Sequence, residues 1–578
     1  TPLAASARVF LGWGPILRVD VGRPPAVPQL LLYHDGILGA AIYRWNGDIS
    51  SLSTYDFGTD TRAIPFDVLG HGPSRALVIG AAGGHEVLAS LWFGAGHVDA
   101  VELNPVTTDL VRNRLASFDG HLAQNPKVTY TTGDGRSYLA RTARHYGLIW
   151  YPAPDSYAAT NGALASAYVL SESYLYTTDA VVADLQHLTG DGMFVVQFGE
   201  VDTGYQLRTL RFVATARAAL ARLGVSDPSD HVLVAQTQQN FIGASPTSTI
   251  VVKRSAFTPA ELAGFGGALR VVPDTEALAA PAGSAAGPVA RYMATPAAGL
   301  PAFYASYPFD VTPTTDNDPF FWHFARFGTV LANYGQSLSS TDRENAVGER
   351  VLLLLVALSA VIAAVFLLLP FAAIRSTWVQ LPHKALSGVF FAGLGFGFIF
   401  FEITLMQLLN LFLGYPTYAL TITLMTLLVS TGLGALASTR VRRPRRAVTT
   451  LLVLVAGLCL FYLVGLGPLT RALLAAPMAA RVAVSLAALA PLGLCLGMFM
   501  PLGLREIARL SAYPRTYVAW GWAANGFASV VGSATATILA MSFGFDLVLG
   551  LGLGCYVVAT GAWLGLTGRP ASSGAVGS

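Results

Sequence analysis

Cysteine and charge are both scarce in this chain. Only 3 of its 578 residues are cysteine, and all three lie in apolar stretches. They therefore predict neither a disulfide framework nor a zinc site, and no metal site is expected elsewhere. Charged residues make up only 12% of the chain, and the net charge of +3 is too small and too dispersed in the first half for a nucleic-acid surface. We expect Cys459, Cys495 and Cys555 to be buried apolar side chains.

Apolar residues are abundant instead. They make up 53% of the chain, which has a mean hydropathy of +0.52, and the excess follows Arg350. About 20 apolar residues are enough to cross a bilayer as a helix. The sequence therefore predicts a multi-pass integral membrane protein with the lipid bilayer as a partner. The expected all-α bundle has seven spans, near 350–373, 385–412, 416–438, 447–467, 481–503, 516–541 and 544–567.

Polar side chains interrupt the second of these spans. A carboxylate in the middle of an apolar helix is costly unless it is paired or faces the bundle interior, so Glu402 is a functional candidate. The alternative interpretation is a hydrogen bond from Glu402 to Gln407, Asn410 or Asn525 that only fixes helix packing.

The stretch from Arg75 to Pro105, RALVIGAAGGHEVLASLWFGAGHVDAVELNP, carries the clearest local pattern in the first half. It predicts a short buried strand, a glycine-rich turn, a helix and a second strand that ends on an acid. Glycines let a ligand approach the start of the helix, and the acid suits a ribose diol. A nucleoside site is therefore expected at Gly80, Gly83, Gly84 and Glu102. Tight packing between strand and helix would explain the glycines nearly as well.

The rest of the first half alternates strands and helices. This order predicts a parallel doubly wound α/β sheet, preceded by hairpin strands at 30–44 and 49–55 and followed by antiparallel strands at 232–236 and 248–252. The expected domains are a small β region (1–70), a Rossmann-like domain (71–255), a partly ordered connector (256–348) and a transmembrane helical domain (349–570).

Together these motifs resemble the spermidine synthase family, which has the S-adenosylmethionine-type Rossmann fold. Gly133-Asp134-Gly135 follows a strand, as the family's adenine-contacting G-D-G does, and Tyr146 to Trp150 matches the strand before its catalytic loop. In the second half, Phe400 to Ile403, Leu413 to Leu420 and Trp520 to Ser533 resemble bacterial fused membrane spermidine synthases. The resemblance implies S-adenosylmethionine or its decarboxylated form as cofactor, Asp134 at the adenine, and a bacterial inner (plasma) membrane location.

The glycine loop departs from this family at one acid. Spermidine synthases carry an acidic residue inside the loop where this chain has Gly83. Glu86 follows three residues later. It replaces the missing carboxylate, or it is a solvated acid in the first turn of the helix, where the helix dipole favours it.

The catalytic loop departs as well. The family's D-S-S-D-P aligns with Pro152-Ala153-Pro154-Asp155, so its first acid is lost, because proline cannot accept a proton. By this resemblance Asp155 would act as base or amine anchor beside Tyr157, while Tyr174 and Tyr176 would line the acceptor pocket. The alternative is a loop turn with packed tyrosines.

A cluster of acidic and aromatic residues lies within the expected connector, at Asp316-Asn317-Asp318-Pro319-Phe320-Phe321-Trp322. This pattern is typical of a turn cap whose aromatic rings pack on the domain or at a membrane interface. A cation or amine site is the alternative.

Positive charge gathers in three loops between the expected spans. The positive-inside rule puts these loops in the cytoplasm, and counting back one span puts the Rossmann-like domain outside it, where S-adenosylmethionine is not expected. A miscounted span, helices missing upstream or a domain that no longer uses this cofactor would resolve the conflict. Residue 1 is Thr and no signal peptide is visible, which fits a processed or truncated chain. The loops contain Arg375 and Lys384; Arg440, Arg442, Arg443, Arg445 and Arg446; and Arg505, Arg509 and Arg515.

Three functions fit these observations. The first is a membrane-bound enzyme that transfers an aminopropyl or methyl group to a small-molecule amine or a lipid-like acceptor, a reaction that depends mostly on positioning. The second is a catalytically degenerate domain that serves as a scaffold or accessory subunit of a membrane complex. The third is a transporter with Glu402 in its path and a nucleoside-sensing domain.

Overall fold

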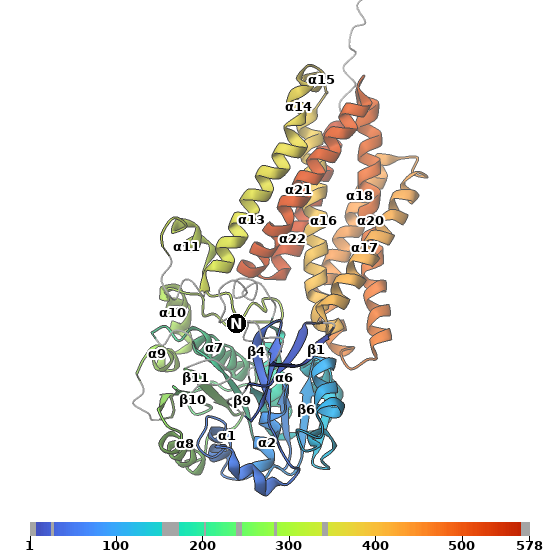
Figure 1. Cartoon of the computed structure of the whole chain (residues 1–578). Coiled ribbons are helices and arrows are strands. Elements are labelled where there is room, and N and C mark those ends of the chain that lie inside the picture. Colours follow the sequence, from blue (N-terminus) through green and yellow to red (C-terminus); the bar gives the residue numbers. More distant parts are fainter. Residues whose placement is uncertain are drawn as a thin grey trace, which may run out of the picture. The chain divides into compact units, whose positions relative to one another are not determined.

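A computed structural model describes residues 7–14, 16–24, 28–152, 173–200, 204–238, 246–281, 286–337 and 345–567. The chain divides into two compact units, Thr1–Gly348 and Glu349–Ser578 (Figure 1). The first unit contains both sheets and the second contains only helices. The predicted fold class, an α/β Rossmann-like sheet with a small N-terminal β region and a helical second half, is confirmed.

The first unit is built on an eight-stranded sheet with the order β12-β10-β11-β9-β8-β5-β6-β7. Strands β5 to β9 pair in parallel, whereas β9 to β12 pair antiparallel. The chain runs outwards from β5 in both directions, which makes the end of β5 the switch point where doubly wound sheets bind ligands. The strands are β5 (Ala76–Ile79), β6 (Val98–Glu102), β7 (Val128–Thr132), β8 (Tyr146–Pro152), β9 (Leu188–Gly199), β10 (Val232–Thr237), β11 (Thr247–Val252) and β12 (Thr275–Ala279).

Helices cover both faces of this sheet (Figure 1). Leu148 and Trp150 of β8 pack with α1, α2 and α8, whereas Ile149 and Tyr151 pack with α6 and α7. Burial on both faces explains why the strand reads as an unbroken apolar run. The helices of this unit are α1 (Ala63–Leu69), α2 (His85–Trp92), α3 (Pro105–Asp109), α4 (Gly135–Arg141), α6 (Thr178–Gln186), α7 (Leu207–Arg222), α8 (Pro259–Val271), α9 (Pro288–Ala294), α10 (Leu300–Ser306) and α11 (Phe327–Ala332).

A second sheet precedes this core, with the antiparallel order β1-β2-β3-β4. The predicted hairpin is confirmed at the turn between β3 and β4, where Asp35 and Gly36 have φ angles of 50° and 88°. Two consecutive positive values are what a two-residue hairpin turn requires. The strands are β1 (Arg8–Trp13), β2 (Arg18–Gly22), β3 (Leu30–His34) and β4 (Ile37–Ile42).

The strand predicted at 49–55 is wrong. Residues Ile49–Thr54 form a 3-10 helix, η2, instead. Asp48 caps this helix, because its carboxylate accepts hydrogen bonds from the Ser50 backbone N–H (3.0 Å) and the Ser50 hydroxyl (2.6 Å). Such local bonds from an aspartate compete with sheet pairing.

The acidic and aromatic cluster at 316–322 packs onto the main sheet. The Phe321 and Trp322 rings lie in the same buried cluster as α6 and α7, which confirms the packed-turn interpretation. The Asp316 carboxylate accepts from Arg136 through both of its oxygens (3.1 Å each) and from the Thr177 hydroxyl (2.7 Å). Because Arg136 and Thr177 engage Asp316, this acid is not available as a ligand for a cation or amine.

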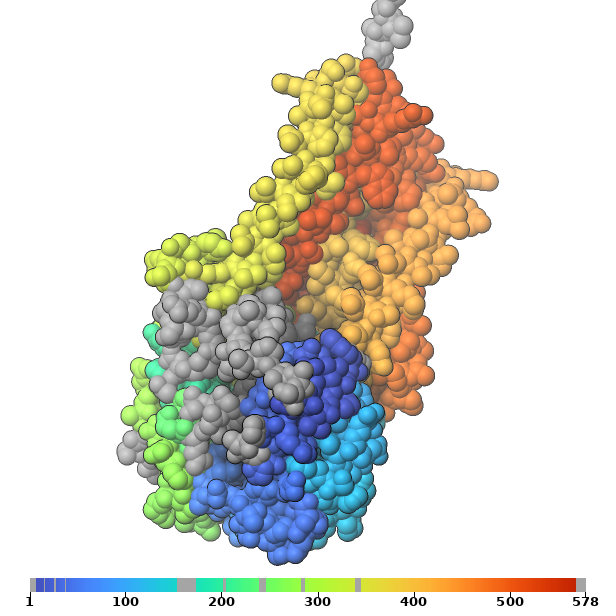
Figure 2. Space-filling model, viewed as in Figure 1, coloured from blue at the N-terminus to red at the C-terminus, as the bar shows by residue number. Residues whose placement is uncertain are grey.

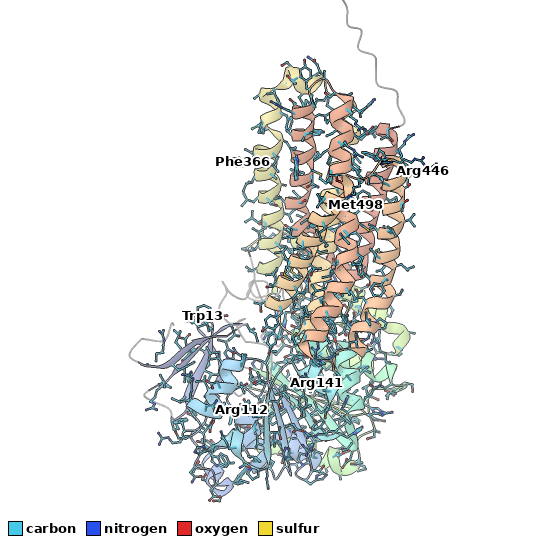
Figure 3. The ribbon with its side chains drawn as sticks, turned by 90° about the vertical axis from the view of Figure 1, so that its right-hand side faces the viewer. Trp13, Arg112, Arg141, Phe366, Arg446 and Met498 are labelled. Atoms are coloured by element: carbon cyan, nitrogen blue, oxygen red, sulfur yellow. The ribbon has the colours of Figure 1, made fainter. Side chains whose placement is uncertain are left out.

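The second unit contains seven helical spans that are long and apolar enough to cross a membrane, as predicted. Large apolar side chains lie exposed on them, among them Phe366 (73%) and Val453 (70%). Figure 3 shows Phe366 directed away from the bundle. Exposure on this scale is typical of a surface that lipid covers. The spans are Val347–Ala373 (α13, η8 and α14), Lys384–Leu413 (α16), Pro416–Ser438 (α17), Pro444–Ala472 (α18, η9 and α19), Met478–Leu510 (α20), Pro514–Phe543 (α21) and Phe545–Thr567 (α22).

Small residues bring these helices close together. A Cβ atom added at Gly395 of α16 would overlap the backbone of Asn525 of α21, and one added at Gly497 of α20 would overlap Thr431 of α17. Helices in lipid gain no hydrophobic free energy by associating, so the van der Waals packing that such close backbone approach allows helps to hold them together.

Candidate functional site

The loops that follow β5, β6 and β7 meet at Glu102, the last residue of β6. One carboxylate oxygen accepts from the Ala82 backbone N–H in the glycine loop (3.0 Å), and the other accepts from the Asn104 N–H (2.7 Å). The Glu102 backbone carbonyl accepts from the Gly133 N–H in the next loop (2.9 Å). The structure therefore brings the three predicted motifs together at the carboxyl edge of the sheet.

The glycine loop has an unusual backbone. Gly80 and Gly84 have φ angles of 86°, and Ala82 between them has a φ of 42°. The hydroxyl of Tyr130, on β7, donates to the Ala82 carbonyl and holds this strained residue in place. The sequence analysis did not identify Tyr130. The available signal was a tyrosine, an aromatic residue with a hydroxyl, between two threonines in a strand that lies next to a buried strand.

The N-terminal sheet packs against this loop. A Cβ atom at Gly83 would overlap the carbonyl oxygen of Ala41 in β4, and one at Gly84 would overlap the side chain of Leu122. Ala82 also joins the apolar cluster that the N-terminal sheet forms with Leu110. Figure 2 shows the dark blue N-terminal residues on the surface beside the lighter blue ones that follow them. Close packing thus accounts for glycine at 83 and 84, but the contacts are with β4 and Leu122 and not between strand and helix.

Burial dominates the electrostatics of Glu102. Its side chain is only 8% exposed, and this burial raises the pKa of its carboxyl, partly offset by the hydrogen bonds from the Asn104 and Ala82 N–H groups. A carboxylate has about four acceptor positions, and the backbone N–H groups of Ala82, Leu103 and Asn104 use three of them. The position that remains can accept from one hydroxyl of a ribose.

The acid at the start of α2 is not solvated, and that expectation is wrong. Glu86 is buried and forms a salt bridge with Arg62 at 2.8 Å, and Arg62 also contacts Asp60 at 3.0 Å. His85 is buried as well, with its ring stacked on Tyr43 at 3.7 Å. Burial, aided by the Arg62 charge, lowers the pKa of His85 well below its usual range. Because Arg62 already holds Glu86, this acid is not placed to replace the missing loop carboxylate.

The Gly133-Asp134-Gly135 turn ends β7 and begins α4. Asp134 caps α4, since its carboxylate accepts from the Ser137 N–H (2.8 Å). A Cβ atom at Gly135 would overlap Ile79, whereas at Gly133 the nearest atom would be Arg141 Nη2 at 3.8 Å. Gly133 is therefore the residue of this turn with open space beside it.

The end of β8 carries the predicted catalytic loop. Pro152 is its last residue and is buried, and Asp155 and Tyr157 lie outside the described residues. Tyr151, next to Pro152, donates to both oxygens of Asp184 on α6 (2.9 and 3.0 Å). Burial raises the pKa of Asp184 to about 7.

The two tyrosines expected in the acceptor pocket have different surroundings. Tyr176 is fully buried, with its ring packed against Phe198, Phe212 and Phe321. Tyr174 is half-buried, and its carbonyl accepts from Arg136 (2.8 Å). Tyr176 thus belongs to the aromatic core, whereas Tyr174 is partly exposed.

Glu402 and Gln407 both lie within α16 and are half-buried. Among the described residues, Glu402 forms no hydrogen bond or ion pair. Asn525, one of its expected partners, donates instead to the Phe391 carbonyl (3.2 Å). The Glu402 carboxylate therefore has no packing role that these contacts explain.

Comparison with known proteins finds solved structures that share the fold at low sequence identity. No family model matches the chain, and no curated protein matches it. It is similar to spermidine synthase from Thermotoga maritima, with 14% identity, a TM-score of 0.32, and 46% of this chain and 80% of that chain covered. It is also similar to a spermidine synthase in complex with the transition-state analogue AdoDATO, with 14% identity, a TM-score of 0.31, and 46% of this chain and 79% of that chain covered. A third similar structure is a probable spermidine synthase from Corynebacterium glutamicum ATCC 13032, with 12% identity, a TM-score of 0.34, and 51% of this chain and 95% of that chain covered.

Proposed function

We propose that the first unit binds an S-adenosyl-type nucleoside, S-adenosylmethionine or its decarboxylated form, where β5, β6 and β7 end. The observation that carries the proposal is the position of the Glu102 carboxylate against the backbone of the glycine loop. A carboxylate at the end of the second strand suits a ribose hydroxyl. Gly133, whose N–H donates to the Glu102 carbonyl, and Asp134 beside it would receive the adenine.

The proposed reaction is alkyl transfer from the sulfonium of this donor. The acceptor's lone pair bonds to the methyl or aminopropyl carbon, the carbon–sulfur bond breaks, and its electron pair stays on sulfur as a neutral thioether. We assign the acceptor's proton to Asp155, assisted by Tyr157, because Pro152 cannot accept it. A sulfonium is already a good leaving group, so the task of the protein is mainly to position the two reactants.

The seven apolar helices support an integral location, which we propose to be a bacterial inner membrane. A membrane enzyme of this kind would take a small amine or a lipid-like molecule as acceptor. Tyr174, which is half-buried, would line the acceptor pocket.

A scaffold or accessory subunit is the second candidate function. Two observations favour it: the Glu102 side chain is only 8% exposed, and Gly83 lies against β4 rather than beside open space. The basic loops support it too, since they would put the first unit outside the cytoplasm. A transporter is the third candidate, favoured by the Glu402 carboxylate in α16, which has no partner among the described residues.

Calorimetry on the full-length protein in detergent tests nucleoside binding. The titrants are S-adenosylmethionine, its decarboxylated form and methylthioadenosine. We expect heat with at least one of them, and an affinity at least about 10-fold lower, or about 1.4 kcal/mol, for Glu102→Gln. Glu276→Gln, which changes an exposed acid on the edge strand β12, is the matched control and should bind normally. No heat with any of the three titrants would favour the scaffold.

The transporter needs a different measurement. Loss of the cellular function in Glu402→Gln, with calorimetric binding of the nucleoside intact, would favour it over the transferase. Normal function in the same variant would remove its only support.

A further inference from the structure

One end of the second unit is strongly basic. Consecutive spans run in opposite directions, so the loop before α16, the loop between α17 and α18, and the loop between α20 and α21 share this end. These segments hold ten basic residues and one acid: Arg375, Lys384, Arg440, Arg442, Arg443, Arg445, Arg446, Arg505, Glu506, Arg509 and Arg515. The positive-inside rule requires only an excess of Lys and Arg in these loops, and it does not require that their side chains surround a common site.

Part of this charge surrounds a hollow. A cavity of about 530 Å³ is lined by Arg443, Pro444, Arg445, Arg446, Glu506, Arg509 and Thr567. The residues come from the start of α18 and the ends of α20 and α22. Figure 3 shows Arg446 near one end of the bundle, directed outward. Three arginines from the start of α18 and one from the end of α20 thus line one hollow, and all four are exposed.

The charges around this cavity are not balanced within the described residues. None of its four arginines forms a salt bridge there. Arg445 donates from Nε to the Thr567 hydroxyl (2.9 Å), and Glu506 is the one acid in the lining. Four exposed guanidinium groups against one carboxylate give the lining a net charge of about +3, which attracts an anion.

We propose that this cavity binds the phosphate of an anionic phospholipid headgroup. Arginine forks match phosphate oxygens in pairs, and the dipole of α18, an 18-residue helix that begins at Pro444, adds positive potential at the same place. The position of the cavity favours a lipid headgroup over a soluble anion as its ligand. The cavity lies where apolar spans end, and exposed apolar side chains such as Val453 and Leu454 of α18 offer a surface for an acyl chain. The inference rests on the proposed membrane insertion but not on nucleoside binding.

Lipid retention by the purified full-length protein tests the proposal. The protein is extracted in detergent and incubated with phosphatidylglycerol, cardiolipin, phosphatidylcholine or inorganic phosphate, and the bound lipid or anion is measured. We expect at least about 10-fold tighter binding of the anionic lipids than of phosphatidylcholine, and no comparable binding of phosphate. Phosphate that binds as tightly as lipid would overturn the lipid assignment.

Two fourfold variants separate a built site from a general surface potential. Replacing the lining arginines with glutamine (R443Q, R445Q, R446Q and R509Q) should lower anionic-lipid binding at least 10-fold. Replacing four basic residues of the same end that do not line the cavity (R375Q, R440Q, R442Q and R515Q) should change it less than about 2-fold. Equal losses in both would overturn the proposal, as would no anionic preference in the wild type.

A charge-conserving variant keeps the test decisive if the glutamine variant fails to fold. Lysine at the same four positions keeps the charge but loses the paired hydrogen bonds of the guanidinium. Binding that falls about 3- to 10-fold supports arginine forks on phosphate, and unchanged binding would overturn them. A wild-type protein that does not sediment with membranes would instead refute the proposed membrane location itself.

Discussion

Gly83 and Gly133 both belong to motifs that suggest ligand binding, yet their surroundings differ. Gly83 lies against the Ala41 carbonyl, so an alanine there must displace β4. At Gly133 the nearest atom to an added Cβ would be 3.8 Å away, so the fold accepts a side chain. Gly83→Ala should therefore lower the thermal midpoint with or without nucleoside. Gly133→Val should keep a near-wild-type midpoint and lower nucleoside affinity about 10-fold in calorimetry. Wild-type affinity in Gly133→Val would remove this turn from the site.

Asp184 should make the stability of the first unit depend on pH. Its folded pKa is about 7, against an ordinary value of 3.8, because burial penalises the charged form. The folded state therefore binds this proton more tightly than the unfolded state, and the unfolding free energy falls as pH rises from about 4 to about 7. Asp184→Asn removes the charge and keeps an acceptor for Tyr151. At pH 8 this substitution should raise the free energy of unfolding by up to about 4 kcal/mol, and with it the thermal midpoint. At pH 4 it should change neither. An equal change at both pH values would contradict this explanation.

At the scale of elements, one ion pair fastens the 316–322 segment to the main sheet. Arg136 on α4 and Asp316 are both largely buried, with side chains 6% and 14% exposed, and they share two hydrogen bonds. Asp316→Asn leaves a buried guanidinium without its counter-charge and should cost about 3–5 kcal/mol. Asp109→Asn breaks an exposed pair with Arg114 and should cost less than about 1 kcal/mol. Denaturation that shifts equally in the two variants would show that Arg136 finds another partner.

Local pattern was enough to predict most elements but not the contacts between them. Apolar runs predicted β5, β6 and β8, because strands buried on both faces carry that signal. The strand expected at 49–55 failed because the Asp48 side chain caps a helix there. Glu86 looked solvated because its partner, Arg62, lies 24 residues earlier in the chain. The same limit applies to the candidate site: the pattern predicted Glu102 at the end of a strand beside a glycine loop, but the contact of β4 with Gly83 depends on a distant sheet and has no local signal.

At the scale of the whole molecule, the orientation of the spans decides which function is tenable. The first span begins at Val347, and the basic loops lie at the other end of the spans. The positive-inside rule then predicts that the first unit is outside the cytoplasm. Labelling of single cysteines with a membrane-impermeant maleimide on intact cells tests this, in a background without Cys459, Cys495 and Cys555. A cysteine at Glu276 should react directly, and one at Arg442 only after permeabilisation.

The reverse labelling pattern would carry the opposite consequence for the chemistry. If the cysteine at Glu276 did not react on intact cells, the first unit would face the cytoplasm, where S-adenosylmethionine is available to enzymes. This result would favour the transferase over the scaffold. The lipid site would then face the outer leaflet, and the arginines around Pro444 would have to be explained without the positive-inside rule. If Glu276→Cys reacts as we expect, a nucleoside must be supplied outside the cytoplasm for Glu102 to bind it. The calorimetric experiment then becomes the stricter test, because only measured affinity would justify a transferase in that location.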